Sequence, residues 1–257
     1  IVSISDKIET LISIFISGKR PSGSSDPYAL RRNLNGVITT IWQFELNLDI
    51  ENIFRELLEY WIISLPNLKF VKEKVLIDLI DFTNQRIISH LDELSISKDL
   101  IKAICFISSS TDKSIMNILD LKKKIDTINQ LKGKAEFSEI QKVITRISKL
   151  AESGNLKTTI FSYEDNVNPD LFEKECENKV FEFIKKLEEI IKSPDWDYFQ
   201  LFELFVNNSN NLNELFDNEK GVLIMIDNPK IRNNRLNLLG LIRNYSLKIA
   251  DFTLFNS

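Results

Sequence analysis

The chain has 257 residues, a formal net charge of −4 and a sequence pI near 5.3. A chain of this length buries roughly 70–75% of its unfolded surface, which is enough for one large or two ordinary domains. Apolar residues make up 43% and charged residues 27%, which is typical of a soluble globular protein, and no apolar run is long enough for a membrane span. The negative net charge excludes wholesale coating of nucleic acid, so any RNA contact must come from local basic faces.

Helix-forming residues dominate, and only seven Gly and six Pro interrupt the chain. Apolar residues recur at helical spacing along most of it, which predicts an all-α fold. No internal repeat of fixed period appears, which disfavours a solenoid. The predicted helices occupy, in chain order, residues 2–18, 30–44, 49–66, 71–88, 98–107, 112–131, 137–150, 168–194, 195–205, and a last stretch from 228 nearly to the C-terminus.

Several helix ends carry recognisable signals. Gly18 suits the left-handed position that follows a helix, and Asp26 is expected to cap the next helix with Pro27 as its first residue. Asn168-Pro169 repeats that arrangement, and Asp195 is expected to open an aromatic-rich helix. The third helix is expected to bury one stripe: Ile53, Leu57, Tyr60 and Trp61.

Two segments are predicted to be loops. The serine run at 108–110 is a plausible border between domains, and residues 158–168 lack a clean period. Cys105 and Cys176 lie far apart inside helical patterns, so we expect both to be reduced and buried, as suits the cytoplasm. Because the chain begins with Ile1 inside an apolar pattern, we expect it to be part of a longer protein.

Residues that could carry catalysis are scarce. His90 is the one histidine, without partners for a metal site or a nucleophile triad, and no glycine-rich phosphate loop is present. We therefore expect no catalytic residue, no metal site and no cofactor within this chain.

The segment 17–32 has a particular order of residues, S-G-K-R-P-S-G-S-S-D-P-Y-A-L-R-R. It resembles a stretch of bacterial glycyl-tRNA synthetase beta subunits that is close to G-x-x-P-T-G-S-x-D-P-F-A-L-R-R. Ser22 stands here in place of the family's Thr, and Tyr28 in place of its Phe.

A second resemblance lies in the last helix, where 231–239 is I-R-N-N-R-L-N-L-L and 249–254 is I-A-D-F-T-L. These segments are similar to the closing helix of DALR-type anticodon-binding domains, which is close to A-L-R-x-N-R-L-x-L-L and ends in a V-A-D-F/I-S-L-L tail. The chain keeps Arg232 and the Asn-Arg-Leu of 234–236, and departs at Pro229-Lys230-Ile231.

Basic residues on two helices are candidates for RNA contact. Arg232 and Arg243 point almost the same way, off the apolar face of their helix, and Arg235 lies at its border. Lys142, Arg146 and Lys149 share another face; it matches the family only at Arg146 and Ile147. The arginines of the last helix could hold phosphate oxygens, or they could pair with Asp227, Asp251 or neighbouring helices. The basic residues of the other face could contact the tRNA backbone, or they could simply form a solvated helix face. The predicted RNA-binding residues are Arg146, Lys149, Arg232, Asn233, Arg235 and Arg243.

The resemblance implies the C-terminal portion of such a beta subunit. Residues 1–108 would be the end of an HD-like helical region, and residues 109–257 an anticodon-binding helical bundle. In the family, the alpha subunit activates glycine with ATP and Mg²⁺, and the beta subunit recognises tRNA within an α2β2 heterotetramer. This chain would then bind the anticodon arm of glycine tRNA, in the cytoplasm, as a subunit of glycine–tRNA ligase.

Two alternatives stay open at this stage. Arginyl and cysteinyl synthetases carry related anticodon-binding bundles, although their catalytic domains make the 17–32 segment unexpected. A non-catalytic helical scaffold or degenerate HD-domain protein is the other. The absence of salt-sensitive binding to glycine tRNA would distinguish this scaffold. The segment Ile4-Ser5-Asp6-Lys7-Ile8 resembles the A-D-K/R-L segment of HD-type phosphohydrolases, whose other metal ligands would lie upstream of Ile1, so we expect Asp6 to be structural.

Overall fold

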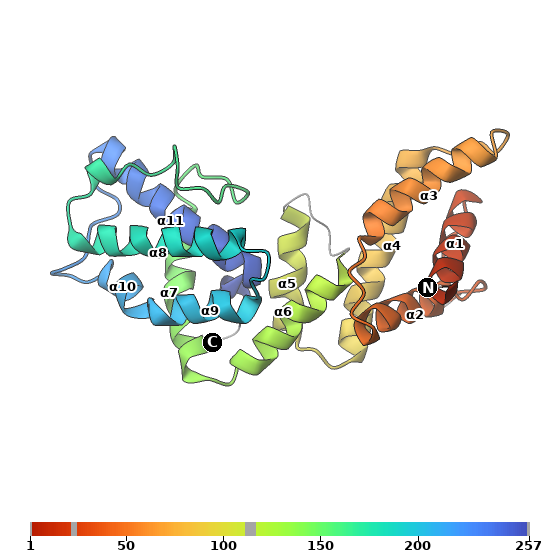
Figure 1. Cartoon of the computed structure of the whole chain (residues 1–257), viewed down its shortest axis with the longest axis horizontal. Helices are drawn as coiled ribbons and strands as arrows, with labels where there is room; N and C mark the ends of the chain where they lie inside the picture. Colours follow the sequence, from red (N-terminus) through yellow and green to blue (C-terminus); the bar gives the residue numbers. More distant parts are fainter. Residues whose placement is uncertain (1, 22–24, 111–116, 256–257) are drawn as a thin grey trace. The chain divides into compact units, whose positions relative to one another are not determined.

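The computed structural model describes residues 2–21, 25–110 and 117–255. Over these residues it consists of eleven α-helices and two short 3₁₀ helices, without a strand, so the all-α prediction is confirmed (Figure 1). The chain divides into two compact units, the first formed by 1–101 with 108–123 and the second by 102–107 with 124–257. None of the described helices is long and apolar enough to cross a bilayer.

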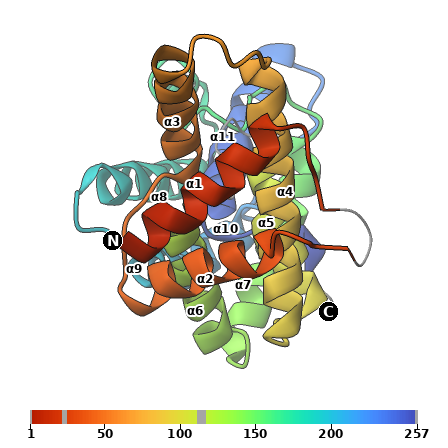
Figure 2. The same ribbon diagram turned by 90° about the vertical axis from the view of Figure 1, so that its right-hand side faces the viewer.

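The first unit is built on four helices, with parts of α5 (Lys98–Ser110) and α6 (Ile118–Leu131) added to each unit. Helix α1 packs on α2 and α4, and α3 packs against α4 (Figure 2). Their buried faces close a core that includes Leu11, Phe15, Leu34, Phe54 and Leu79. The four helices are α1 (Val2–Ile16), α2 (Leu30–Gln43), α3 (Ile50–Ser64) and α4 (Lys72–Glu93).

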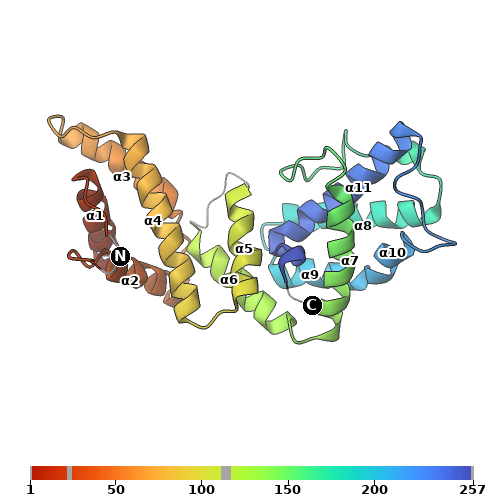
Figure 3. The same ribbon diagram turned by 180° about the vertical axis from the view of Figure 1, so that it is seen from behind.

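The second unit is built around α7 (Ala135–Ala151) and α11 (Pro229–Ile249), which pack on each other and cross obliquely (Figure 3). Helices α8 and α9 pack against α11, and α10 packs against α7 and α8. An aromatic cluster that joins Phe137, Phe202 and Phe252 fills the core, with ring centroids 5.7–6.4 Å apart. The remaining elements are η1 (Pro169–Leu171), α8 (Glu175–Lys192), α9 (Tyr198–Asn207), α10 (Ser209–Glu214) and η2 (Phe252–Leu254).

The end of α1 confirms the role predicted for Gly18. Its φ of 78° is left-handed, and its amide donates to the carbonyl of Phe15 at 3.0 Å. The amide of Lys19 donates to Ile14 at 3.3 Å, which completes the two hydrogen bonds of a Schellman motif.

Asp26 caps α2, but from further away than predicted. Its carboxylate accepts from the amides of Leu30 at 2.8 Å and Arg31 at 3.0 Å, which the first turn of a helix leaves unsatisfied. Helix α2 begins at Leu30 after a turn that contains Pro27, so the prediction that Pro27 is its first residue is wrong. Ser22 and Gly23 of the same segment lie outside the described residues.

Helix α3 buries a different stripe from the predicted one. Ile50, Phe54 and Leu58 are fully buried, whereas Tyr60 is 62% exposed. Ile53, Leu57 and Trp61 are only half-buried. Because this helix is apolar on two neighbouring faces, periodicity alone could not decide which of them meets the core.

Some predicted boundaries are displaced. Helix α5 continues to Ser110, so the loop predicted at 108–110 is wrong, and α4 extends past 88 to include His90. Asn168-Pro169 opens only the short η1, since α8 starts at Glu175. Asp197 rather than Asp195 caps α9, because its carboxylate accepts from the amide of Gln200 at 2.7 Å. The loop predicted at 158–168 is confirmed, and so is the start of α11 at Asn228-Pro229.

Both cysteines are free and buried, as predicted. Burial raises the pKa of the Cys105 thiol to about 12.

We therefore expect iodoacetamide to alkylate Cys105 at pH 8 roughly 1,000-fold more slowly in the folded chain than in urea, measured by mass spectrometry. Because the unfolded thiol ionises at lower pH, this residue should also weaken the fold as pH rises from about 9 toward 12. Rapid alkylation of folded chain would contradict its burial.

Candidate nucleic-acid interface

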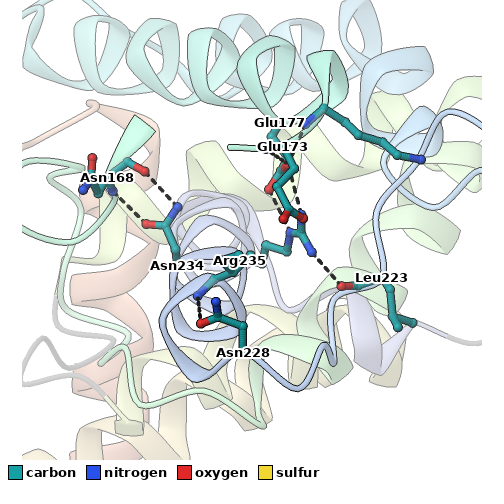
Figure 4. A network of polar contacts seen from close by, with 9 residues as sticks. Asn168, Glu173, Glu177, Leu223, Asn228, Asn234 and Arg235 are labelled. Carbon is teal, nitrogen blue, oxygen red and sulfur yellow. Dashed lines mark hydrogen bonds and ion pairs between the residues drawn. The ribbon is translucent and has the colours of Figure 1, made fainter. Parts of the chain in front are cut away.

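Arg235 on α11 is the most deeply placed of the predicted RNA-binding residues, with a side chain 2% exposed. Its Nε donates to Glu177 at 2.8 Å and its Nη2 to Glu173 at 2.7 Å. Its Nη1 donates to the carbonyl of Leu223 at 3.0 Å (Figure 4). Arg235 is thus bound to α8 and to the loop before α11, and its guanidinium is not available to an external phosphate.

Glu177, the main partner of Arg235, is completely buried at the start of α8. Its carboxylate also accepts from the amides of Glu173 at 2.8 Å and Lys174 at 3.1 Å. Burial alone would lower the pKa of Arg235, but its hydrogen bonds to Glu177 and Glu173 outweigh that effect and raise the pKa above its ordinary value. Arg235 therefore stays charged, and its hydrogen bonds to Glu177 join α11 and α8.

Asn234, the neighbour of Arg235 in the family-like motif, also has an internal role. Its side chain accepts from the amide of Asn168 at 2.7 Å and donates to the carbonyl of Asn168 at 3.0 Å (Figure 4). The Asn-Arg pair that signals the family in the sequence thus fixes two loops to α11.

Arg243 behaves similarly, although it is only half-buried. Its Nη2 donates to the carbonyl of Leu156 at 2.7 Å, and its Nε to the side chain of Asn244 at 3.0 Å. Burial lowers the pKa of this guanidinium below its ordinary value. Two of its donors are therefore used inside the unit.

Four predicted residues remain accessible. Arg146 and Lys149 are exposed on α7, on the face opposite the buried Ile144 and Ile147. The guanidinium of Arg146 lies over the ring of Phe216, 4.2 Å from its centroid, which holds the side chain in place while leaving it exposed.

Arg232 and Asn233 lie in the first turns of α11, where the macrodipole favours an anion, although Asn228 already accepts from the first amides of the helix. Asn233 is exposed and Arg232 is half-buried, with Nη1 3.5 Å from the carbonyl of Ile226. These two and the exposed face of α7 form the candidate interface. No cluster of side chains able to hold a metal ion occurs among the described residues.

Sequence reasoning missed the segment 216–228, which the structure connects to both parts of this interface. Arg146 contacts its first residue, Phe216, and Arg232 contacts Ile226 near its end. The one available signal was a short apolar run, Val222 to Ile226, outside any helical pattern.

Comparison with known proteins identifies the relatives of this chain. The family model described as glycyl-tRNA synthetase beta subunit matches residues 1–106. A glycine–tRNA ligase beta subunit of Picosynechococcus sp. is 32% identical over 98% of this chain. One of Gloeothece citriformis is 31% identical and one of Clostridioides difficile 28% identical, each over 98% of the chain.

The chain spans about a third of the length of these relatives, between 34% and 35% in the three cases. The chain belongs to the glycyl-tRNA synthetase beta-subunit family, as its sequence motifs predicted.

Proposed function

We propose that this chain is the tRNA-recognition portion of the beta subunit of a glycine–tRNA ligase. In this proposal the second unit is the anticodon-binding bundle and the first is the end of an HD-like region. The anticodon arm of glycine tRNA lies against the exposed face of α7 and the start of α11. A separate alpha subunit, joined in an α2β2 heterotetramer, carries out the ATP- and Mg²⁺-dependent activation of glycine.

The observation that carries the proposal is a set of basic side chains left accessible on a unit whose other arginines are used internally. Lys142, Arg146 and Lys149 follow one another at i, i+4 and i+7 on α7, and all are exposed. Three cations on one helical face give a surface that phosphates can approach despite the negative net charge of the chain. The names of the relatives support tRNA as the ligand.

The buried arginines are not expected to contact RNA. Arg235 is excluded as an RNA contact because its guanidinium is buried against Glu177. Arg243 is a weaker contact because its Nη2 already donates to Leu156. Arg146, Lys149, Arg232 and Asn233 are then the groups that touch RNA, through phosphate contacts and through hydrogen bonds to unpaired bases.

Binding of fluorescent glycine tRNA to the full chain, titrated at several salt concentrations, tests this function. Replacing Arg146 and Lys149 together with glutamine should weaken binding about tenfold and reduce the slope of log affinity against log salt by about 1.5, because two phosphate contacts are lost. Lys186→Gln, which removes an exposed charge from α8, is the matched control and should change neither quantity.

A non-cognate tRNA completes the experiment. Tighter binding of glycine tRNA supports anticodon recognition, whereas equal binding would reduce the proposal to general RNA affinity. No salt-dependent binding of either tRNA would contradict the proposal and favour a helical scaffold without RNA binding.

A further inference from the structure

The loop between α10 and α11 exposes two large apolar side chains that are separated by one residue in the sequence. Leu223 is 70% exposed and Met225 is 50% exposed, while Ile224 between them is buried. Alternation of this kind turns one side chain into the unit and its two neighbours outward. Exposed apolar groups close together on a surface often mark a binding site.

The backbone of this loop is held firmly, so the exposure of Leu223 and Met225 is not a consequence of a loose chain. The amide of Val222 donates to Leu215 at 3.0 Å, and that of Gly221 to Asp217 at 3.1 Å. A Cβ at Gly221 would lie 2.5–2.6 Å from backbone atoms of Asp217 and Leu215, so the chain passes too closely there for any side chain.

Three cations further fix the loop through its carbonyl groups. Arg235 donates to Leu223 at 3.0 Å, and Arg232 lies 3.5 Å from Ile226 (Figure 4 shows the first of these). Lys174 donates to Glu219 at 2.9 Å. The buried pair of Arg235 and Glu177 therefore supports the exact residue whose side chain faces solvent.

The surroundings of the loop indicate what those side chains meet. Arg146 stacks on Phe216 at the start of the loop, and Arg232 contacts its end. The loop thus begins and ends at two arginines of the candidate interface, and it exposes an apolar pair. A single-stranded nucleic acid offers groups for both, since its phosphates are negative and its unpaired bases have apolar faces.

The loop also carries three exposed acidic groups: Asp217, Glu219 and Asp227. The carboxylate of Asp217 accepts from the amides of Lys220 and Glu219, both at 2.8 Å, and these hydrogen bonds lower its pKa, so it stays negatively charged. Because these carboxylates repel phosphates, the loop itself is suited to contact with the faces of bases rather than with phosphates.

We infer that Leu223 and Met225 form a preformed apolar platform on which unpaired bases of the bound RNA stack. The inference rests on the proposed function and adds the site where bases, rather than phosphates, are held. Leucine and methionine are among the apolar side chains that pack against bases, and methionine adapts its shape to different rings.

The test compares two RNA stem-loops of equal length and charge, one with intact loop bases and one with abasic loop nucleotides. With the intact RNA, the Leu223→Ala/Met225→Ala double variant of the full chain should bind about tenfold more weakly than the unchanged chain. With the abasic RNA, the two chains should bind equally, and the salt dependence should be the same throughout. Leu254→Ala, at another exposed leucine, is the matched control.

Each outcome has a distinct meaning. Unchanged affinity of the double variant for the intact RNA would overturn the platform, and so would an equal loss on both RNAs, since stacking requires bases. An equal thermal midpoint of variant and unchanged chain confirms that folding is not responsible for a loss. If the unchanged chain binds neither RNA, the proposed function itself fails. A loss of affinity in the double variant alone would not have that meaning, because it tests only the apolar platform.

Discussion

Replacing Arg235 with methionine is expected to lower the free energy of unfolding of the second unit by about 3–5 kcal/mol. The substitution leaves the carboxylate of Glu177, which is completely buried, without its cationic partner. It also leaves the carbonyl of Leu223 without the donor that now lies 3.0 Å away. Removing one member of a buried pair costs much more than the pair itself contributes, because the remaining charge has lost its hydration.

Hydrogen exchange at increasing urea, followed by mass spectrometry of peptides from α8 and α11, measures this loss in the second unit alone. Lys230→Met is the matched control, since Lys230 is exposed one turn before Arg235, and it should change the stability by less than about 0.5 kcal/mol. Adding Glu177→Gln to Arg235→Met should restore part of the stability. Glutamine removes the buried charge and keeps an oxygen for the amides of Glu173 and Lys174. A double variant no more stable than the single one would show that charge burial is not the cause.

Ten of the eleven α-helices among the described residues, and their order, could be predicted because their signals are local; the short α10 was missed. At the predicted starts of α3 and α11, Asp49 accepts from the amide of Asn52, and Asn228 accepts from the amides of Lys230 and Ile231. The choice of a buried face on α3 could not be predicted in the same way. Ile53 and Phe54 are adjacent and both apolar, and only the packing of α3 on α4 buries Phe54 completely.

The candidate site shows a sharper limit of sequence reasoning. Arg146 and Arg235 both lie at helical positions next to apolar residues, yet the first is exposed and the second is buried. The difference is that Arg235 has a buried partner, Glu177, which lies 58 residues away in the sequence. No local sequence pattern predicts a partner at that distance. The alternative of pairing with a neighbouring helix, left open for Arg235, is the one that the structure shows.

Amide side chains of α11 also have internal roles, because they bind the irregular segment 157–168. Asn237 donates to the carbonyl of Asn166 at 2.7 Å. Asn244 donates to Lys157 at 2.8 Å and to Ile160 at 2.6 Å. A segment without regular structure leaves its backbone polar groups unpaired unless side chains or water satisfy them, so these residues give the loop a defined path.

Asn244 is therefore the second position where a single change should have a large effect. The side chain is completely buried, and its oxygen also accepts from Arg243 at 2.9 and 3.0 Å. Asn244→Leu removes the donor of the Ile160 carbonyl, one of the two donors of the Lys157 carbonyl and the acceptor of a half-buried guanidinium. At about 1–3 kcal/mol for each unsatisfied group, the expected loss of stability is about 2–4 kcal/mol after partial relaxation.

The loop gives this prediction a local measurement. Trypsin should cleave after Lys157 faster in Asn244→Leu than in the unchanged chain, because the carbonyl of Lys157 loses one of its two donors and keeps only the amide of Ile160 at 3.1 Å. Amide exchange over 157–161 should accelerate with it. Asn233→Leu, an exposed position on the same helix, is the matched control and should alter neither rate. If cleavage at Lys157 is unchanged while the global stability falls, Asn244 acts through the core, and the loop is held mainly by other contacts such as the hydrogen bond from the Tyr245 hydroxyl to Phe161 at 2.5 Å.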